Sequence, residues 1–376
     1  TGAIHFAMTH SEPGGLREIW NDIGAGLSAR GHKVERFVFY PSGGVDQRAA
    51  AEAEGWHHVL RTRATGPFGV IRLIFALVRY LRCTQPAAVV TAMPFANVLM
   101  PLAVRLAGTT TRVFITHHSP ADTHNRMLDR IDTYTGQMAC VAAVVCVSNA
   151  VSASLDAKPE GYRMKRRTIH NALPGRIEAM IDAVRAQVGE GNGTAKIAGR
   201  IVALGRLSYQ KNYPMLIRAM SRVPLATLDI VGAGEDEEAL SALARDCGVA
   251  GRVRFLGLMP REQALAHAAT AQIFVQVSHY EGHSLALIEA ARMGLALVVS
   301  NVPVQVEGIT NPSGQQCGIA VPIGEDMALG GVLVRLLADE QERRQWSERA
   351  RALGLAVSNA AMVDAYESLL VCGRSK

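Results

Sequence analysis

Short apolar runs alternate with amphipathic stretches along almost the whole chain, and this alternation constrains the fold more than any other feature of the sequence. Each apolar run has the length and composition of a buried strand, and a segment of helical length follows it. Strands that alternate with helices predict α/β domains with parallel sheets built from right-handed βαβ units. The predicted strands cover residues 4–8, 34–39, 88–93, 112–117 and 142–148, and then 200–207, 227–232, 253–257, 272–278 and 296–300.

The strand series restarts near residue 200, which predicts two Rossmann-like domains. A chain of 376 residues also exceeds the roughly 250–300 residues that one hydrophobic core organises. We place the first domain at residues 1–171 and the second at 200–350, with a linker at 172–199 that contains a helical run and the Gly-rich sequence EGNGT. Ligands bind beyond the carboxyl ends of the strands in such sheets, so the residues after each strand are the candidates for a site.

Composition narrows the class of protein. Apolar residues form 49% of the chain and charged residues 19%, which excludes a disordered or acidic-tail protein. No apolar stretch reaches the ~18 residues that cross a bilayer, and the opening IHFAMTH has the pattern of a strand rather than a signal peptide. The cysteines lie apart, without a C-x-x-C pair, which predicts a reduced, cytoplasmic protein without a zinc site. They are Cys83, Cys140, Cys146, Cys247, Cys317 and Cys372.

Positive charge concentrates in the first half of the chain. Residues 1–170 contain 19 Lys and Arg against 12 Asp and Glu, and no acidic residue occurs between Glu54 and Asp122. The cluster RMKRR at residues 163–167 adds to this charge. The first half is therefore predicted to face an anionic partner.

Residues 68–82, FGVIRLIFALVRYLR, have the length and composition of a helix with an arginine stripe. The stripe consists of Arg72, Arg79 and Arg82, and apolar residues occupy the rest of the surface. The interpretation that we favour is a core helix whose arginines face water. The alternative is a peripheral surface that lies against anionic lipid at the inner face of the membrane.

Two motifs follow strands of the first domain. Gly14 and Gly15 precede a predicted helix, where glycines let backbone amides approach a ligand, although a plain tight turn explains the pair equally well. His117 and His118 follow the strand RVFI and point in opposite directions in an extended chain. One of them then faces the ligand edge of the sheet and can donate a hydrogen bond to a sugar hydroxyl or share developing charge; the alternative is a surface histidine.

Two cations follow the first strand of the second domain. Arg206 and Lys211 lie in the loop GRLSYQKN, before a helix that begins after Pro214. Two cations at a strand end, next to a helix, suit a diphosphate, whereas the simpler alternative is a solvated loop.

Two carboxylates stand eight residues apart in EGHSLALIEAARMG. Glu281 is predicted in a loop, and Glu289 lies inside the helix that begins near Ser284, among apolar neighbours. Eight helical residues rise roughly 12 Å, which exceeds the ~5–9.5 Å between the two carboxyl groups of a glycosidase. We therefore expect the pair to contact two parts of one elongated ligand, with backbone amides between them for a phosphate. The alternative is one solvated and one helix-surface glutamate.

Motifs of several other chemistries are missing. The chain has no D-x-D to hold a metal on a diphosphate, and no G-x-S-x-G, G-K-[ST] or H-E-x-x-H. A metal-held diphosphate, an α/β-hydrolase, a P-loop enzyme and a zinc protease are therefore not favoured.

The combination of GRLSYQKN, IVGAGEDEEAL, VRFLG and SHYEGHSLALIEAARMG resembles the second half of family 4 retaining glycosyltransferases. The segments SARGHKV, THHS, VCVSNAV and IHNALP in the first half resemble the same family more loosely. The resemblance implies the GT-B fold, in which two Rossmann-like domains face each other across a cleft. It implies that residues 1–171 bind the acceptor, that residues 200–350 bind the nucleotide sugar, and that a helix at 351–376 packs back on the first domain.

The resemblance also implies roles for individual residues. Arg206 and Lys211 would bind the donor diphosphate, Glu289 the nucleotide ribose and Glu281 the transferred sugar beside the reacting carbon. His118 fits the catalytic histidine of the first domain better than its neighbour, because it holds the last position of the T-x-H pattern. Further donor contacts would come from Gly15, Gly232, His283, Ser284 and Leu285.

The implied reaction is retaining transfer by front-face attack, with the donor diphosphate stabilised by cations rather than by a metal. No cofactor is expected; the donor would be a UDP- or GDP-sugar, and the acceptor a glycan, a glycolipid or another hydroxyl compound. Nucleic acid is not an expected partner. Two other classes stay open: an epimerase or hydrolase of nucleotide sugars, which would consume donor without acceptor, and a non-catalytic two-domain binding protein, which would tend to lose some of the motifs.

Overall fold

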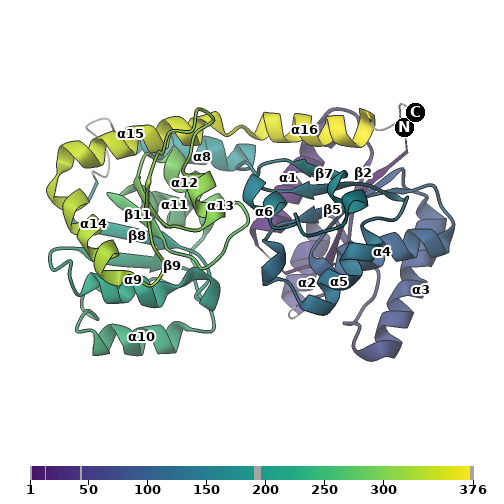
Figure 1. The fold of residues 1–376 in the computed structure, drawn as a ribbon, viewed down its shortest axis with the longest axis horizontal. Helices are drawn as coiled ribbons and strands as arrows, with labels where there is room; N and C mark the ends of the chain where they lie inside the picture. The colour runs from purple at the N-terminus through teal and green to yellow at the C-terminus, as the bar shows by residue number, and fades with distance from the viewer. Residues whose placement is uncertain (1, 13, 43–44, 190–195, 373–376) are drawn as a thin grey trace. The chain divides into compact units, whose positions relative to one another are not determined.

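The computed structural model describes residues 2–12, 14–42, 45–189 and 196–372. The internal contacts divide the chain into two compact units. Unit 1 comprises Thr1–Asn171 and Asn359–Lys376, and unit 2 comprises Ala172–Ser358. Each unit is a parallel sheet with helices on both faces (Figure 1), so the two predicted Rossmann-like domains are confirmed.

Unit 1 is built on a seven-stranded sheet in the order β3-β2-β1-β4-β5-β6-β7. Its central strands are buried on both faces because helices cover both, which explains their continuous apolar runs. In register, Ile4 of the first strand pairs with Val34 on one side and Ala88 on the other. The strands are β1 (Ile4–His10), β2 (Val34–Tyr40), β3 (Trp56–His58), β4 (Ala88–Ala92), β5 (Arg112–His117), β6 (Val141–Cys146) and β7 (Arg166–Thr168).

The helices of unit 1 include the last helix of the chain, α16, which packs on α1. Glu367 of α16 forms an ion pair with Arg30 and a hydrogen bond with His32 Nε2 at 2.6 Å, and a Cβ at Gly26 of α1 would lie 2.9 Å from Val363. The glycine therefore lets the two helices approach closely. The helices are α1 (Gly15–Ala29), α2 (Val45–Ala53), α3 (Gly66–Thr84), α4 (Pro94–Ala107), α5 (Arg126–Thr135), α6 (Asn149–Ala153), α7 (Glu160–Arg163) and α16 (Asn359–Cys372), with a 3-10 turn η1 (Ala121–Thr123).

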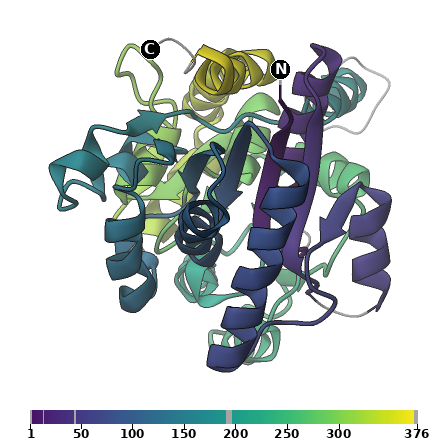
Figure 2. The same cartoon turned by 90° about the vertical axis from the view of Figure 1, so that its right-hand side faces the viewer.

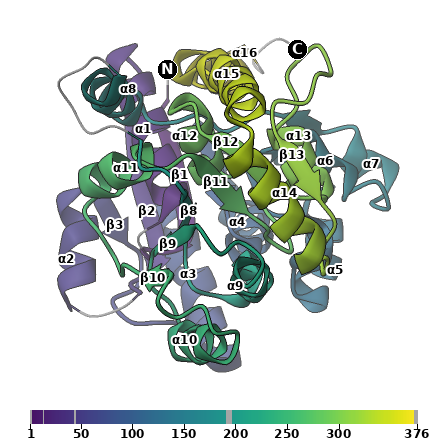
Figure 3. The same cartoon turned by 90° about the vertical axis from the view of Figure 1, so that its left-hand side faces the viewer.

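Unit 2 has a six-stranded sheet in the order β10-β9-β8-β11-β12-β13. Apolar side chains of α9, α10 and α14 contribute to one core cluster, and those of α8, α11 and α12 contribute to another. Figure 3 labels these helices on the ribbon. The strands are β8 (Arg200–Leu204), β9 (Thr227–Val231), β10 (Val253–Phe255), β11 (Ile273–Gln276), β12 (Ala296–Ser300) and β13 (Ile319–Val321). The helices are α8 (Gly175–Gly189), α9 (Tyr213–Met220), α10 (Glu237–Asp246), α11 (Arg261–Ala269), α12 (Leu285–Arg292), α13 (Pro303–Gly308), α14 (Asp326–Ala338) and α15 (Glu340–Ala356), with a 3-10 turn η2 (Tyr209–Lys211).

Two predicted boundaries differ from the structure. The segment that we expect as a linker, residues 172–199, mostly belongs to unit 2, because Ile177 and Ile181 of α8 are fully buried in its core; the sequence EGNG within it lies outside the described residues. The returning helix begins at Asn359 and not at residue 351, since α15 remains in unit 2 and Ala350 packs in that core.

The strand orders place the predicted motifs at the ligand edges of the sheets. Strand β1 lies between β2 and β4, and β8 lies between β9 and β11, so each sheet reverses its order beside its first strand. Crevices form at such switch points beyond the carboxyl ends of the strands. The glycines after β1 and the cationic loop after β8 follow the switch strands directly. Among the helices within the described ranges, none is both long and apolar enough to span a bilayer.

Candidate functional site

The loops after β8 and β11 bring Lys211 and Glu281 together. Lys211 Nζ donates to Glu281 Oε1 at 2.7 Å, and both side chains are largely buried. Ser278 Oγ donates to the same oxygen at 2.8 Å, and Gln210 Nε2 donates to Oε2 at 3.3 Å. A buried carboxylate needs such partners because burial disfavours an isolated charge. Glu281 is therefore anchored beside an ammonium group that a second anion can share.

Backbone geometry fixes the position of Lys211. Gly205, directly after β8, has a φ of 144°, and a Cβ at this residue would lie 2.6 Å from Lys211 Cε. Glycine permits both this conformation and the close approach of the lysine side chain. Asn212, with a φ of 50°, donates its Nδ2 to the carbonyl of Val277 at 3.1 Å. This bond ties the lysine loop to the chain just after β11.

Gly232, directly after β9, packs against the backbone at the start of the same loop. Its φ is 143°, and a Cβ there would lie 2.0 Å from the carbonyl oxygen of Gly205. The amide of Gly232 donates to the carbonyl of Gly257 at 2.9 Å. The predicted donor contact of Gly232 therefore cannot use this amide, and the residue acts through close backbone packing.

Arg206 lies in the same loop as Lys211 but holds a different carboxylate. Its Nε donates to Glu235 Oε2 at 3.1 Å, and both side chains are mostly exposed. Exposed pairs of this kind contribute only about 0–1 kcal/mol. Replacing the Arg206–Glu235 ion pair by a contact between Arg206 and a diphosphate therefore costs little free energy.

Glu289 lies in the second turn of α12 and is 3% exposed. Arg261, the first residue of α11, donates its Nη2 to Glu289 Oε1. The carboxylate is thus neither solvated nor on a helix surface, which removes that alternative. A ligand hydroxyl that reaches Glu289 would compete with the guanidinium of Arg261 or share the carboxylate with it.

The N-terminus of α12 lies in the chain between the two glutamates. Ser284 caps the helix: its Oγ accepts from the amide of Leu287 at 3.4 Å and donates to Gln276 Oε1 at 2.9 Å. Within the described ranges, no backbone carbonyl accepts the amides of Ser284 or Leu285. Helix starts with such N–H groups bind anions. Ser284 and Leu285 can therefore meet a phosphate through their backbones, and the partly exposed His283 precedes them.

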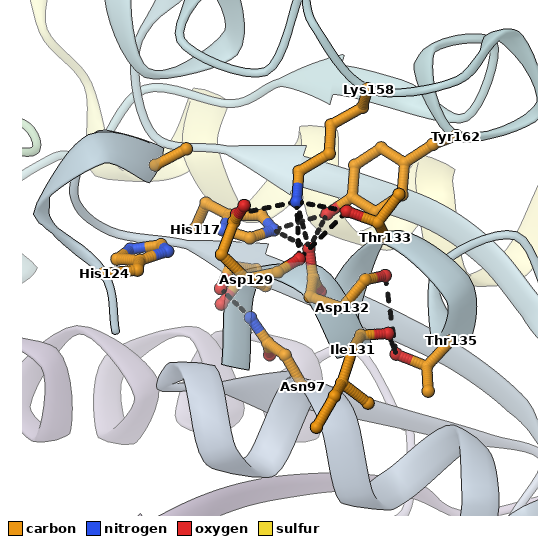
Figure 4. Close-up of polar contacts among 12 residues, drawn as sticks. Asn97, His117, His124, Asp129, Ile131, Asp132, Thr133, Thr135, Lys158 and Tyr162 are labelled. Atoms are coloured by element: carbon orange, nitrogen blue, oxygen red, sulfur yellow. Dashed lines mark hydrogen bonds and ion pairs between the residues drawn. The ribbon is translucent and has the colours of Figure 1, made fainter. Parts of the chain in front are cut away.

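In unit 1, His117 ends β5 and turns into a buried polar network (Figure 4). Its Nε2 lies 2.8 Å from Tyr162 Oη, which donates to Asp132 Oδ2 at 2.7 Å. Lys158 Nζ completes the network by donating to Asp129 Oδ1 at 2.6 Å. Burial lowers the pKa of His117. The neutral ring of His117 is therefore part of the hydrogen-bond network of the core.

His118 lies on the opposite side of β5, as an extended chain predicts. Its Nε2 lies 2.8 Å from Thr116 Oγ1, and the Thr116 hydroxyl donates to the carbonyl of Thr91, also at 2.8 Å. A hydroxyl carries one proton, so Thr116 accepts from the Nε2–H of His118. The Nδ1 atom of His118 is then a hydrogen-bond acceptor. The neutral ring therefore offers no donor from Nδ1 to a sugar hydroxyl, which is one of the two roles expected at this position.

Protonation does not change this polarity near neutral pH. Burial, with a smaller contribution from His117, lowers the pKa of His118 to about 3. The ring is therefore neutral, and it cannot act as a general acid.

The glycines after β1 precede a helix, α1, that packs near His118. Trp20 of α1, the helix that begins at Gly15, has its ring centroid 6.4 Å from that of His118. Gly14 has an extended φ of 165°, and a Cβ there would meet nothing within 4 Å. Neither backbone conformation nor packing requires a glycine at this position, which counts against a plain tight turn. Open space at a helix N-terminus suits the approach of a ligand.

Some partners of the site residues could not be selected from the sequence: Arg261 lies outside every motif, and Ser278 and Thr116 lie inside SHYEG and THHS without a predicted contact. Arg261, Ser278 and Thr116 act on Glu289, Glu281 and His118. The apolar setting of Glu289 predicts that it needs a partner, but nothing in the sequence selects Arg261 among 39 Lys and Arg residues.

The fold and this set of residues define a two-domain transferase of the GT-B class. The sequence also matches two family descriptions: "Glycosyltransferase Family 4" over residues 13–173 and "Glycosyl transferases group 1" over residues 192–353. The chain belongs to the family 4 glycosyltransferases. The resemblance seen in its motifs is confirmed over most of its length.

Curated relatives and solved structures agree with this assignment. The chain is 28% identical to the lipopolysaccharide core biosynthesis glycosyltransferase LpsE of Rhizobium meliloti, over 56% of this chain and 59% of LpsE. It is 26% identical to LpsD of the same organism, over 89% of this chain and 92% of LpsD. The crystal structure of Anabaena Alr3699/HepE in complex with UDP superposes with a TM-score of 0.77 at 17% identity, covering 97% of this chain and 98% of that one.

Proposed function

We propose that this glycosyltransferase is a retaining enzyme that moves a sugar from a nucleotide diphosphate to a hydroxyl group of a glycan or glycolipid, without a metal. The arrangement around α12 carries the proposal: buried Glu281 precedes the helix, buried Glu289 lies in its second turn, and Lys211 contacts the first. The names of LpsE and LpsD support a glycoconjugate acceptor, and the UDP complex of HepE supports a UDP-sugar donor.

The donor would lie along the start of α12. Lys211 and Arg206 would bind the diphosphate together with the amides at the helix N-terminus. Glu289 would accept hydrogen bonds from the ribose hydroxyls in place of Arg261. Glu281 would contact the transferred sugar, where its carboxylate is close enough to Lys211 to keep the local charge balanced.

Transfer would proceed from the face that the phosphate leaves. The bond from the anomeric carbon to the diphosphate breaks while the acceptor oxygen bonds to the same face of that carbon, so the configuration is retained. The departing phosphate oxygen takes the proton of the acceptor hydroxyl. Lys211 and Arg206 stabilise the negative charge that develops on the diphosphate. His118 would accept a hydrogen bond from a sugar hydroxyl through Nδ1 and orient the ring, and Gly15 would lie close to the phosphate and the reacting sugar.

Unit 1 would receive the acceptor. Its sequence carries the excess of positive charge, with no acidic residue between Glu54 and Asp122. We therefore propose that the enzyme works in the cytoplasm on an acceptor held at the anionic inner face of a membrane.

Donor turnover with and without acceptor tests the proposed function. UDP- and GDP-sugars are incubated in EDTA with an oligosaccharide acceptor, and the anomeric configuration of the product is read by NMR. If the protein is a retaining transferase, the loss of donor depends on the acceptor, and the product keeps the anomeric configuration of the donor. Lys211→Ala should lower kcat/KM about 10²-fold or more, whereas Arg218→Ala on the exposed side of α9 should not.

Three results would contradict it. Donor consumed equally without acceptor would favour an epimerase or hydrolase. A requirement for added Mg²⁺ or Mn²⁺ would overturn the metal-free reaction. Binding of nucleotide without turnover of any donor would favour a non-catalytic protein.

A further inference from the structure

Helix α3 (Gly66–Thr84) presents large apolar side chains to solvent on one face, and Figure 2 shows this helix in blue in the foreground of unit 1. Phe68 is 87% exposed, Phe75 is 72% exposed and Ile71 is 49% exposed. The helix is held to unit 1 by its other face, through the buried leucines Leu73, Leu77 and Leu81. The packing of α3 on unit 1 therefore does not require the exposed apolar side chains of Phe68, Ile71 and Phe75.

Arginines share this exposed face. Seven residues make about two helical turns, so Arg82 lies in line with Phe68 and Phe75, and Arg72 lies in line with Arg79. All three arginines are exposed. We call this set the α3 outer face: Phe68, Ile71, Arg72, Phe75, Arg79 and Arg82.

No carboxylate neutralises the α3 outer face. Within the part of the chain that the structure describes, none of its three arginines is within ion-pair distance of an Asp or Glu. Arg72 donates to Thr62 Oγ1 at 3.2 Å. Arg82 donates to the carbonyls of Ala107 and Leu106, at the end of α4, at 3.1 and 3.2 Å, so it has a capping role as well.

We propose that the α3 outer face docks on an anionic phospholipid membrane, with Phe68 and Phe75 at the level of the head groups and the arginines on the lipid phosphates. Clustered exposed apolar side chains mark an interaction site, and the unpaired cations select an anionic partner. A second copy of this chain would place the same arginines against each other across a twofold axis, which like charges oppose. The favoured prediction of a plain solvated arginine ridge does not explain the exposed phenylalanines.

Vesicle flotation tests this surface, with vesicles of phosphatidylcholine alone or mixed with phosphatidylglycerol. We expect binding to the mixed vesicles only, weakening as salt rises. Arg72→Gln with Arg79→Gln should lower the partition coefficient about fivefold per arginine, and Phe68→Ser with Phe75→Ser should lower it further. Arg82 is left intact because of its capping bonds. Matched controls on unit 2 are Arg218→Gln with Arg222→Gln, and Leu225→Ser, at exposed positions; these should bind like the parent.

A fluorescent reporter measures insertion directly. Phe75→Trp should show a blue-shifted emission with the mixed vesicles, and brominated lipid should quench it, whereas Leu225→Trp should show neither. The proposal would be overturned if the α3 variants and the unit 2 controls reduced binding equally, or if the parent did not bind at low salt. Self-association or nucleic-acid binding that depends on the α3 outer face would also overturn it. The assay needs neither donor nor acceptor, so it can fail while the proposed transferase activity stands, and the reverse.

Discussion

Thr116 determines which nitrogen of His118 is free to meet a ligand. Its hydroxyl donates to the carbonyl of Thr91, so it holds the proton of His118 on Nε2. We predict that Thr116→Val lowers kcat/KM about tenfold, because one hydrogen bond of this kind is worth about 1 kcal/mol and the ring loses its fixed orientation. Thr116→Ser keeps the hydroxyl and should stay within about threefold of the parent.

The tautomer itself can be observed. In protein labelled with ¹⁵N-histidine, the parent and Thr116→Ser should show His118 protonated on Nε2, and Thr116→Val should show a mixture of tautomers. A loss of activity in Thr116→Val with the parent tautomer retained would mean that Thr116 serves only the packing of β5.

Glu281, which precedes α12, and Glu289, which lies within it, should separate turnover from nucleotide binding. Glu289→Gln weakens the contact to ribose, so we predict at least tenfold weaker binding of bare UDP or GDP by calorimetry. Glu281→Gln keeps a partner for Lys211 while removing charge beside the sugar, so turnover should fall and affinity for the bare nucleotide should stay equal or rise. The reverse pattern would mean that the donor lies along the helix in the opposite direction.

The chemistry of the site could be predicted from the sequence where a residue conflicts with its surroundings. Glu289 is a carboxylate among apolar neighbours, and the structure buries it beside Arg261. Arg206 and Lys211 could be assigned together from their loop, but their separate carboxylates could not. The polarity of His118 depends on the hydroxyl proton of Thr116, which only the folded chain positions.

The close backbone packing of the loops after β8 and β9 can be tested by a single substitution. Gly232 has a φ of 143°, and a Cβ there would lie 2.0 Å from Gly205 O. We predict that Gly232→Ala lowers the free energy of unfolding by at least about 2 kcal/mol and disturbs nucleotide binding through Lys211. Gly331, exposed inside α14, has nothing within 4 Å of its Cβ position, so Gly331→Ala should stabilise by about 0.5–1 kcal/mol. Urea unfolding measures both, and a harmless Gly232→Ala would contradict this account of the loop.

Strands could be predicted from the sequence wherever a long apolar run marks them. The core strands β1, β4 and β5 were predictable because strands covered on both faces read as continuous apolar runs. Of the three-residue edge strands, β10 is predicted as part of the run VRFLG, whereas β3, β7 and β13 are missed. Helix α8 matches the helical run of the predicted linker, but its place in unit 2 is not predicted, although the apolar spacing of Ile177 and Ile181 matches one buried helix face.

At the scale of the whole molecule, the chain forms two units with separate cores, and α16 returns to the first of them. Burial lowers the pKa of six histidines in unit 1: His5, His10, His58, His117, His118 and His124. For His118 and His124 the pKa falls to about 3 and about 4. In unit 2, hydrogen bonds from His267 and Arg254 outweigh burial and lower the pKa of Asp229.

These shifts have opposite consequences in acid. A histidine whose folded pKa lies below its unfolded value of about 6.5 binds protons better when unfolded, so its destabilising effect is small above pH 6.5 and grows as pH falls toward the folded pKa. At pH 5, His118 and His124 each lower the stability of unit 1 by about 2 kcal/mol. A lowered aspartate pKa gives stability that persists until pH falls below about 4, so Asp229 keeps its contribution to unit 2 at pH 5.

We therefore predict that mild acid unfolds unit 1 before unit 2. Trp346→Phe leaves Trp20 and Trp56, both fully buried in unit 1, as the tryptophans of the chain, so fluorescence follows that unit alone. Between pH 7.5 and pH 5.0 the free energy of unfolding from urea titrations should fall by about 4 kcal/mol for this signal, about 2 kcal/mol from each of His118 and His124. His124→Asn should remove about 2 kcal/mol of the pH dependence, because asparagine does not titrate. A urea midpoint for unit 1 that is the same at both pH values would show that these histidines gain no extra protonation on unfolding, and would also undermine the assignment of His118 as a neutral acceptor.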